Sequence, residues 1–320
     1  MRMRAGLVSA IVAVVLLAFG AQAMAAGKAL VSGNGCSMSK DAKAAGEEAA
    51  KKAKAALGDE APKLVLVYYS DPLINKAADV IAGVAAVFPK DVIYGCGSYS
   101  ALTQESNDAA VAVLALGGDV AVSAAVAATK EPKEDAECGK QIGEALKDAA
   151  AKGPGKVLIL FGACHIPRND QVVKGACGVL GEKFPIVGAA ACRDDIVVKG
   201  ELVKQSNVGI LLTGNFACGF GLMKDMTVEG LISSARETFK AAIGDKKDKG
   251  ALVLVFDCGG RRGEMQKNKN LEKELEAMKE VAGATPIFGF YGSGEMGCAG
   301  GDAAPKGVGY HISACAITTE

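Results

Sequence analysis

Polar and charged side chains gather in six short segments, each of which follows an apolar run. The six segments are Ser70-Asp71, Cys96-Gly-Ser98, Cys164-His165, Cys192-Arg193-Asp194-Asp195, Asp257-Cys258-Gly-Gly260-Arg261-Arg262 and Gly292-Ser-Gly-Glu295. Apolar runs of this kind are typical of buried parallel strands, and ligands of such sheets bind beyond the carboxyl ends of the strands. These segments are therefore the predicted binding site.

The charges in these segments have both signs. Arg261 or Arg262 could form two hydrogen bonds to a carboxylate, while Glu295 or Asp194 could accept a hydrogen bond from an ammonium group. An amphoteric small molecule such as an amino acid would suit them. The alternative is that Arg261 pairs with Glu295 or Asp194 and only locks the strand ends together.

Cysteines at the strand ends suggest a second function, a thiol-dependent or redox enzyme. Cys164, Cys192 and Cys258 are the candidate nucleophiles, and a fold could also bring Cys258 to His311 as a hydrolase pair. A protein with a purely structural interaction role is a third alternative. We assign no catalytic residue.

Several other classes of function find no support in the sequence. There is no Cys-x-x-Cys motif and there are only two histidines, so we expect no metal and no haem cofactor. A G-x-G-x-x-G pattern at residues 292–297 is not followed by a helix start, which argues against nucleotide binding. Lys+Arg and Asp+Glu both number 36, so no nucleic-acid partner is expected.

A unit of strand, helix and strand recurs three times along the chain. The paired apolar runs are 64–69 with 92–97, 157–161 with 186–190, and 251–256 with 287–291, and a helix is predicted within each pair. A helical crossover implies that the two strands of each unit are parallel. Stretches 108–116 with 120–128, and 207–220, are predicted to form antiparallel hairpins. The predicted fold is α/β, with mixed parallel and antiparallel sheets and the helices packed outside.

The first 25 residues have the three parts of a secretory signal peptide. Positive charge at Arg2 and Arg4 precedes an apolar run, and the small residues 21–26 follow it, with cleavage expected between about Ala23 and Ala26. The predicted location is periplasmic or secreted, without stable membrane insertion after processing. Ten cysteines in an exported chain favour disulfides, whose pairing the sequence does not determine.

The strand-end motifs resemble those of the FIST family, a bacterial sensory domain with N- and C-terminal parts. The matching segments are Tyr94-Gly-Cys-Gly-Ser98, Gly188-Ala-Ala-Ala-Cys-Arg-Asp194-Asp195, Cys258-Gly-Gly260-Arg261, Gly289-Phe-Tyr-Gly-Ser-Gly294-Glu295 and His311. The resemblance implies an N-terminal-like domain at 27–221 and a shortened C-terminal-like domain at 222–320.

The resemblance further implies a module that senses small molecules such as amino acids. We predict that eight residues bind the ligand: Arg261, Glu295, Arg193, Asp194, Cys258, Gly260, Tyr291 and His311. Family members usually belong to intracellular signalling machinery. An exported copy would therefore need a membrane-bound signalling or transport partner.

Overall fold

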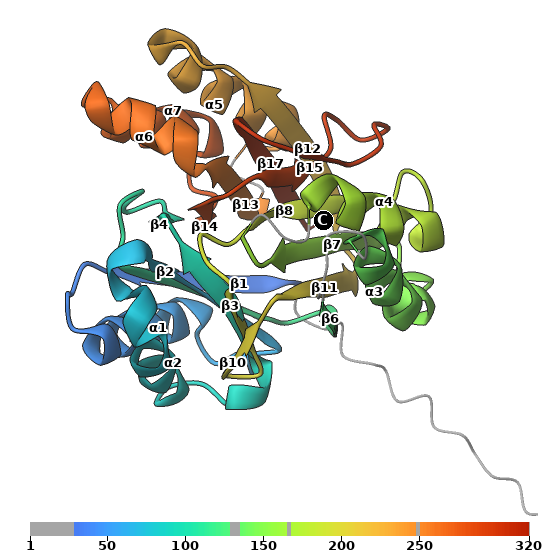
Figure 1. Cartoon of the computed structure of the whole chain (residues 1–320), viewed down its shortest axis with the longest axis horizontal. Coiled ribbons are helices and arrows are strands. Elements are labelled where there is room, and N and C mark those ends of the chain that lie inside the picture. Colours follow the sequence, from blue (N-terminus) through green and yellow to red (C-terminus); the bar gives the residue numbers. More distant parts are fainter. Residues whose placement is uncertain (1–28, 129–134, 165–167, 248–249, 320) are drawn as a thin grey trace, which may run out of the picture.

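The computed structural model describes residues 29–128, 135–164, 168–247 and 250–319. Within them, three units of the chain surround a common centre: blue, green and orange-to-red in Figure 1. The predicted signal peptide and His165 lie outside the described residues. None of the described helices is long and apolar enough to cross a membrane.

Each unit runs strand, helix, strand, helix, strand, and then returns on one more strand. Unit 1 contains β1 (Val31–Ser37), α1 (Ala42–Leu57), β2 (Leu64–Ser70), the short 3-10 helix η1 (Asp71–Lys76), α2 (Ala77–Ala85), the 3-10 turn η2 (Lys90–Val92), β3 (Ile93–Ser98) and β5 (Val111–Gly117). Unit 2 contains β6 (Val120–Ala128), α3 (Asp135–Ala150), β7 (Gly155–Gly162), α4 (Asn169–Leu180), β8 (Ile186–Ala190) and β11 (Ser206–Gly214). Unit 3 contains β12 (Ala217–Lys224), α5 (Val228–Ile243), β13 (Gly250–Cys258), α6 (Gly259–Lys267), α7 (Leu271–Ala282), β14 (Ile287–Gly292) and β17 (His311–Thr318).

The predicted parallel pairs are all present. Strand β2 pairs with β3, β7 with β8, and β13 with β14, each in parallel. In every unit the last strand (β5, β11 or β17) lies between the first strand and the parallel pair, and it is antiparallel to both of its neighbours. The mixed α/β fold class is confirmed, and so is its construction from repeated units.

The three units exchange strands in a cycle. Strand β4 (Ser100–Thr103) of unit 1 pairs with β14 of unit 3, and β15 (Glu295–Gly297) of unit 3 pairs with β8 of unit 2. Strand β9 (Asp195–Val198) of unit 2 pairs with β3 of unit 1. Two further strands, β10 (Glu201–Lys204) and β16 (Lys306–Val308), extend β9 and β15. Each sheet therefore contains at least one strand that belongs to a different unit.

The two predicted hairpins at residues 108–128 and 207–220 are wrong. Strand β5 lies in the first sheet and β6 in the second, while β11 lies in the second and β12 in the third. The glycine turns between them carry the chain from one sheet to the next, since each strand finds its antiparallel partner within its own unit. The actual tight hairpin is β9–β10. The domain boundary predicted between residues 221 and 222 falls inside β12.

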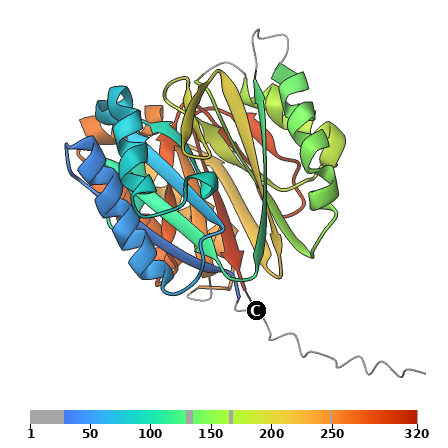
Figure 2. The same cartoon turned by 90° about the horizontal axis from the view of Figure 1, so that it is seen from below.

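The main core lies where the three sheets face one another, and the helices cover the outer faces (Figure 2). Tyr68 of β2 meets Phe288 and Phe290 of β14 there, with ring centroids 5.0 and 4.4 Å apart. The alternate residues Val65 and Val67 of β2 instead pack beneath α1 and α2. Because both faces of the strand are buried, its sequence reads as an unbroken apolar run.

A glycine occupies the same place in the second strand of every unit. Gly95, Gly188 and Gly289 each follow an isoleucine by two positions and lie opposite a residue of the first strand. A Cβ at any of the three would overlap the carbonyl oxygen of that opposite residue. The close approach of the parallel strands therefore requires glycine here.

We expect Gly289→Ala to lower the free energy of unfolding by about 1–3 kcal/mol or more, because the added methyl overlaps the backbone of Val255. The control is Gly178→Ala, at an exposed helical position where an added Cβ meets nothing within 4 Å. That variant should gain roughly 0.5–1 kcal/mol. Urea denaturation measures both, and equal midpoints would contradict the close-packing argument.

Candidate functional site

The carboxyl ends of the three parallel pairs meet at one place. The backbone N–H of Cys192 donates to the carbonyl of Gly97 at 3.0 Å, and that of Tyr99 donates to Tyr291 at 2.9 Å. The N–H of Ser293 donates to the carbonyl of Ala190 at 2.9 Å. These backbone hydrogen bonds connect every unit to another unit. The donor residues lie one or two positions beyond the end of the second strand, in the region where the sequence predicted the site.

Ser293 connects side chains from all three units. The Cys164 thiol donates to the Ser293 hydroxyl at 3.2 Å, and that hydroxyl donates to the Tyr99 hydroxyl at 3.2 Å. Tyr99 and Ser293 are equivalent residues, because each stands one position after the second strand of its unit. A cavity lies on either side of their hydrogen bond.

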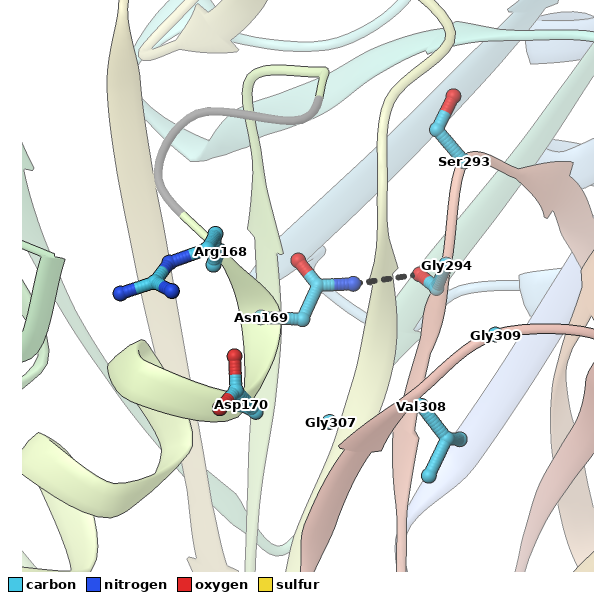
Figure 3. Close-up of a pocket in the computed structure, with 8 residues that line it drawn as sticks. All are labelled: Arg168, Asn169, Asp170, Ser293, Gly294, Gly307, Val308 and Gly309. Carbon is cyan, nitrogen blue, oxygen red and sulfur yellow. Dashed lines mark hydrogen bonds between the residues drawn. The ribbon is translucent and has the colours of Figure 1, made fainter. Parts of the chain in front are cut away.

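The first cavity, which we call the Asn169 cavity, has a volume of about 340 Å³ and lies between units 2 and 3 (Figure 3). It is lined by Arg168, Asn169, Asp170, Ser293, Gly294, Gly307, Val308 and Gly309. The Asn169 amide donates to the Gly294 carbonyl at 2.8 Å across its width. The guanidinium of Arg168 points away from the opening in Figure 3 and pairs with Asp135 at 3.1 Å.

This cavity offers several polar groups and carries little net charge. Ser293 supplies a hydroxyl, Asn169 an amide, and three glycines leave backbone groups within reach of a ligand. Asp170 supplies a carboxylate, which lies 3.5 Å from the Lys174 amine. The volume falls at the small end of the range for small-molecule sites.

The second cavity, which we call the Lys40 cavity, has a volume of about 350 Å³ and lies between units 1 and 3. It is lined by Met38, Ser39, Lys40, Ser70, Pro72, Leu73, Lys76, Tyr99, Asp108, Ala110 and Arg262. The two linings share no residue. At the remaining junction, between units 1 and 2, Asp71 and Arg193 form an ion pair at 3.3 Å.

Arg261, the central residue of the predicted site, is fully buried within unit 3. Its Nε donates to Asp257 at 2.7 Å and its Nη2 to Glu274 at 3.1 Å. The remaining donors reach the Ser234 hydroxyl and the carbonyls of residues 225 and 231, so all five N–H groups have protein acceptors. Burial by itself would lower the pKa of this guanidinium, but Asp257 and Glu274 raise it.

The structure therefore supports neither of the two roles expected for Arg261. It has no free donor with which to bind a ligand, and it pairs with neither Glu295 nor Asp194. Asp257 lies four residues earlier, at the end of β13, and is the nearer partner. Tyr291 belongs to the same buried network, since its hydroxyl donates to Glu274 at 2.7 Å.

Cys258, Glu295 and His311 do come together. The backbone N–H of His311 donates to Glu295 Oε2 at 2.9 Å, while Glu295 Oε1 has no hydrogen-bond partner among the described residues. Burial raises the pKa of Glu295 to about 8 and lowers that of the His311 ring. Gly260 is exposed and could not carry a Cβ without meeting the Tyr310 ring.

Arg193 and Asp194 are exposed at the junction between units 1 and 2. None of the eight predicted residues lines the Asn169 or the Lys40 cavity. The strand-end rule did identify the segments that contain Ser293, Gly294 and Arg262. It missed Asn169 and Val308, because the helix start and the strand that carry them reach this edge only through the tertiary fold.

All ten cysteines are free thiols, so the expected disulfides are absent from the described residues, which include every cysteine. Burial raises the pKa of Cys164, that of Cys192 to about 12 and that of Cys258 to about 11. Within the described part of the chain, no group of His, Cys, Asp and Glu side chains is arranged to hold a metal ion.

A model described as the FIST N domain matches residues 63–230, and one described as the FIST C domain matches residues 193–298. The chain belongs to the FIST family. FIST domains are sensory domains thought to bind small ligands. The family resemblance inferred from the strand-end motifs is thereby confirmed. None of the curated proteins matches this FIST protein.

Two solved structures resemble this FIST protein weakly. Cyanuric acid hydrolase from A. caulinodans has 12% identity and a TM-score of 0.45, and the likeness covers 91% of this chain and all of that one. A chorismatase has 7% identity and a TM-score of 0.44, with 92% of this chain and 99% of that one covered. Likenesses at this level carry no argument about function.

We expect Arg261→Ala to lower the free energy of unfolding by about 3–5 kcal/mol, because it leaves the buried carboxylates of Asp257 and Glu274 without a counter-ion. Arg236→Ala is the matched control, since Arg236 forms an equally short ion pair with the exposed Glu280 on the surface. Its loss should cost less than about 1 kcal/mol. Chemical denaturation compares the two, and similar losses would show that the Arg261 network does not stabilise unit 3.

Proposed function

We propose that this FIST protein is an exported, small-molecule-binding sensory protein whose ligand occupies the Asn169 cavity. The observation that carries the proposal is the position of that cavity. Its walls come from the start of α4 in unit 2 and from the ends of β14 and β16 in unit 3. A ligand held there touches two units at once.

The chemistry of the lining suits an amino acid or a similar small metabolite. The Ser293 hydroxyl would donate to a carboxylate by turning away from Tyr99, backbone N–H groups of the lining would donate as well, and Asp170 would accept from an ammonium group. A ligand that bridges two units favours whichever relative arrangement of those units it fits best. A partner protein that binds this arrangement more tightly would thereby detect that the ligand is bound.

A thiol-dependent reaction gains no support from the site. Cys192 and Cys258 are buried, and the raised pKa values of all three strand-end thiols keep them protonated at neutral pH. The thiolate is the nucleophilic form of cysteine. We therefore propose the binding function alone.

The proposal of export is supported by the first 25 residues, whose charged, apolar and small-residue parts resemble those of a cleavable signal peptide. In this proposal the mature protein acts in the periplasm or outside the cell. A separate membrane-bound partner would then relay or transport what it binds.

We expect a screen of amino acids and small organic acids to raise the melting temperature of the mature protein, taken from residue 27. Ligand at about 100 times its dissociation constant adds about 2.7 kcal/mol of apparent stability. Gly309→Leu should abolish the shift, because it adds a side chain to the cavity wall where a Cβ meets no neighbour.

The matched control is Gly301→Leu, in the preceding loop between β15 and β16 and also in open space. It should respond to the ligand as the wild type does, and both variants should melt like the wild type without ligand. An unchanged response in Gly309→Leu, or silence across the library with folded protein, would reject the Asn169 cavity as the site.

We expect the full-length chain, expressed in a bacterium, to appear outside the cytoplasm with its N-terminus between Ala23 and Ala26. Leu16→Arg should hold the protein inside the cell and unprocessed, because a charge interrupts the apolar run. Cell fractionation and intact mass decide the question. Cytoplasmic wild-type protein of full mass would rule out export while leaving the binding proposal intact.

A further inference from the structure

The Lys40 cavity is built from the starts of three helices. The segment before α1, the 3-10 helix η1 after β2, and the first turn of α6 all contribute to its lining. Strands β1 and β2 are both antiparallel to β5, so they end at the same edge of the sheet. Of the three helices, α1 and α6 are long enough for their N-termini to add a partial positive charge near this cavity.

The side chains of the lining add to this positive potential. Lys40, Lys76 and Arg262 carry three positive charges against the single negative charge of Asp108, which leaves a net +2 (3 − 1). The chain as a whole has a formal charge of zero. Neither Lys40 nor Lys76 forms an ion pair with a residue that the structure describes.

Arg262 also lines this cavity, and one of its guanidinium donors has no acceptor among the described residues. Its Nη2 binds Asp108 and its Nη1 binds Gln266 at 3.0 Å, while its Nε is buried and meets no acceptor in the described part of the chain. A buried donor without an acceptor is costly. The guanidinium also lies over the Tyr291 ring, 5.9 Å from its centroid, which fixes its place.

Large apolar side chains stand beside these charges. Met38 is 60% exposed and Tyr99 is 37% exposed, and both line the cavity together with Pro72 and Leu73. Exposed apolar groups around a charged hollow are covered when a ligand with a hydrocarbon portion binds. An anion with a short carbon chain would satisfy both parts of the lining.

We propose that the Lys40 cavity is a second binding site, which takes a small dianion of the dicarboxylic acid class. One carboxylate lies against Lys40 and Lys76, and the other lies near Arg262. The carbon chain covers Met38 and Tyr99. This site goes beyond the function proposed for the Asn169 cavity, because it differs in position, in lining and in charge.

The test uses isothermal titration calorimetry on the mature protein, with succinate and inorganic phosphate as probes. Succinate should bind, and the double variant Lys40→Gln/Lys76→Gln should weaken its affinity by ~100-fold or more, since each charge-assisted hydrogen bond that is removed weakens binding by ~10-fold. The control Lys51→Gln/Lys54→Gln removes the same charge from α1 at positions outside the cavity. It should bind succinate as the wild type does.

Gly309→Leu separates this inference from the proposed function, because that variant obstructs the Asn169 cavity alone and should still bind succinate. The inference is overturned if succinate fails to bind the folded wild type, or if Lys40→Gln/Lys76→Gln binds it as tightly as the lysine control. Binding of phosphate without succinate would overturn the dicarboxylic acid class.

Discussion

The backbone hydrogen bonds of the exchanged strands are the constraint on which the rest of this structure depends. Without β9, β15 and β4, the strands β3, β8 and β14 would each leave one edge of N–H and C=O groups unpaired. Because the exchange runs in a cycle, no unit has a complete sheet by itself. The central core is made of residues from all three sheets, so no unit buries its inner face without the other two.

The same exchange builds the cavities. Each second strand must be followed at once by a segment that crosses into another unit, and Tyr99 and Ser293 are the first residues of two such crossings. The Asn169 and Lys40 cavities lie beside these two residues, between units. A ligand at either cavity contacts two units, which links binding to the relative positions of parts that the backbone already joins.

Two residues of the strand-end motifs, Arg261 and Tyr291, act within unit 3. Arg261 joins β13 to α5 and α7 through buried ion pairs and hydrogen bonds, and Tyr291 extends that network from β14. A buried guanidinium needs all its donors satisfied, which leaves none for a ligand. Arg261 and Tyr291 therefore stabilise unit 3, while their neighbours Arg262 and Ser293 line the cavities.

The sequence by itself determined the three parallel strand pairs, since unbroken apolar runs with a helix between them admit few other arrangements. It also predicted a site at the strand ends, because that rule depends only on chain direction. Tertiary structure alone decided that β5 and β6 lie in different sheets and that Arg261 pairs with Asp257 and Glu274. Strand pairing and ion pairing depend on distances between remote segments, and local periodicity carries no information about those distances. For the same reason only the fold could bring Asn169 to Gly294 and Arg262 to Asp108.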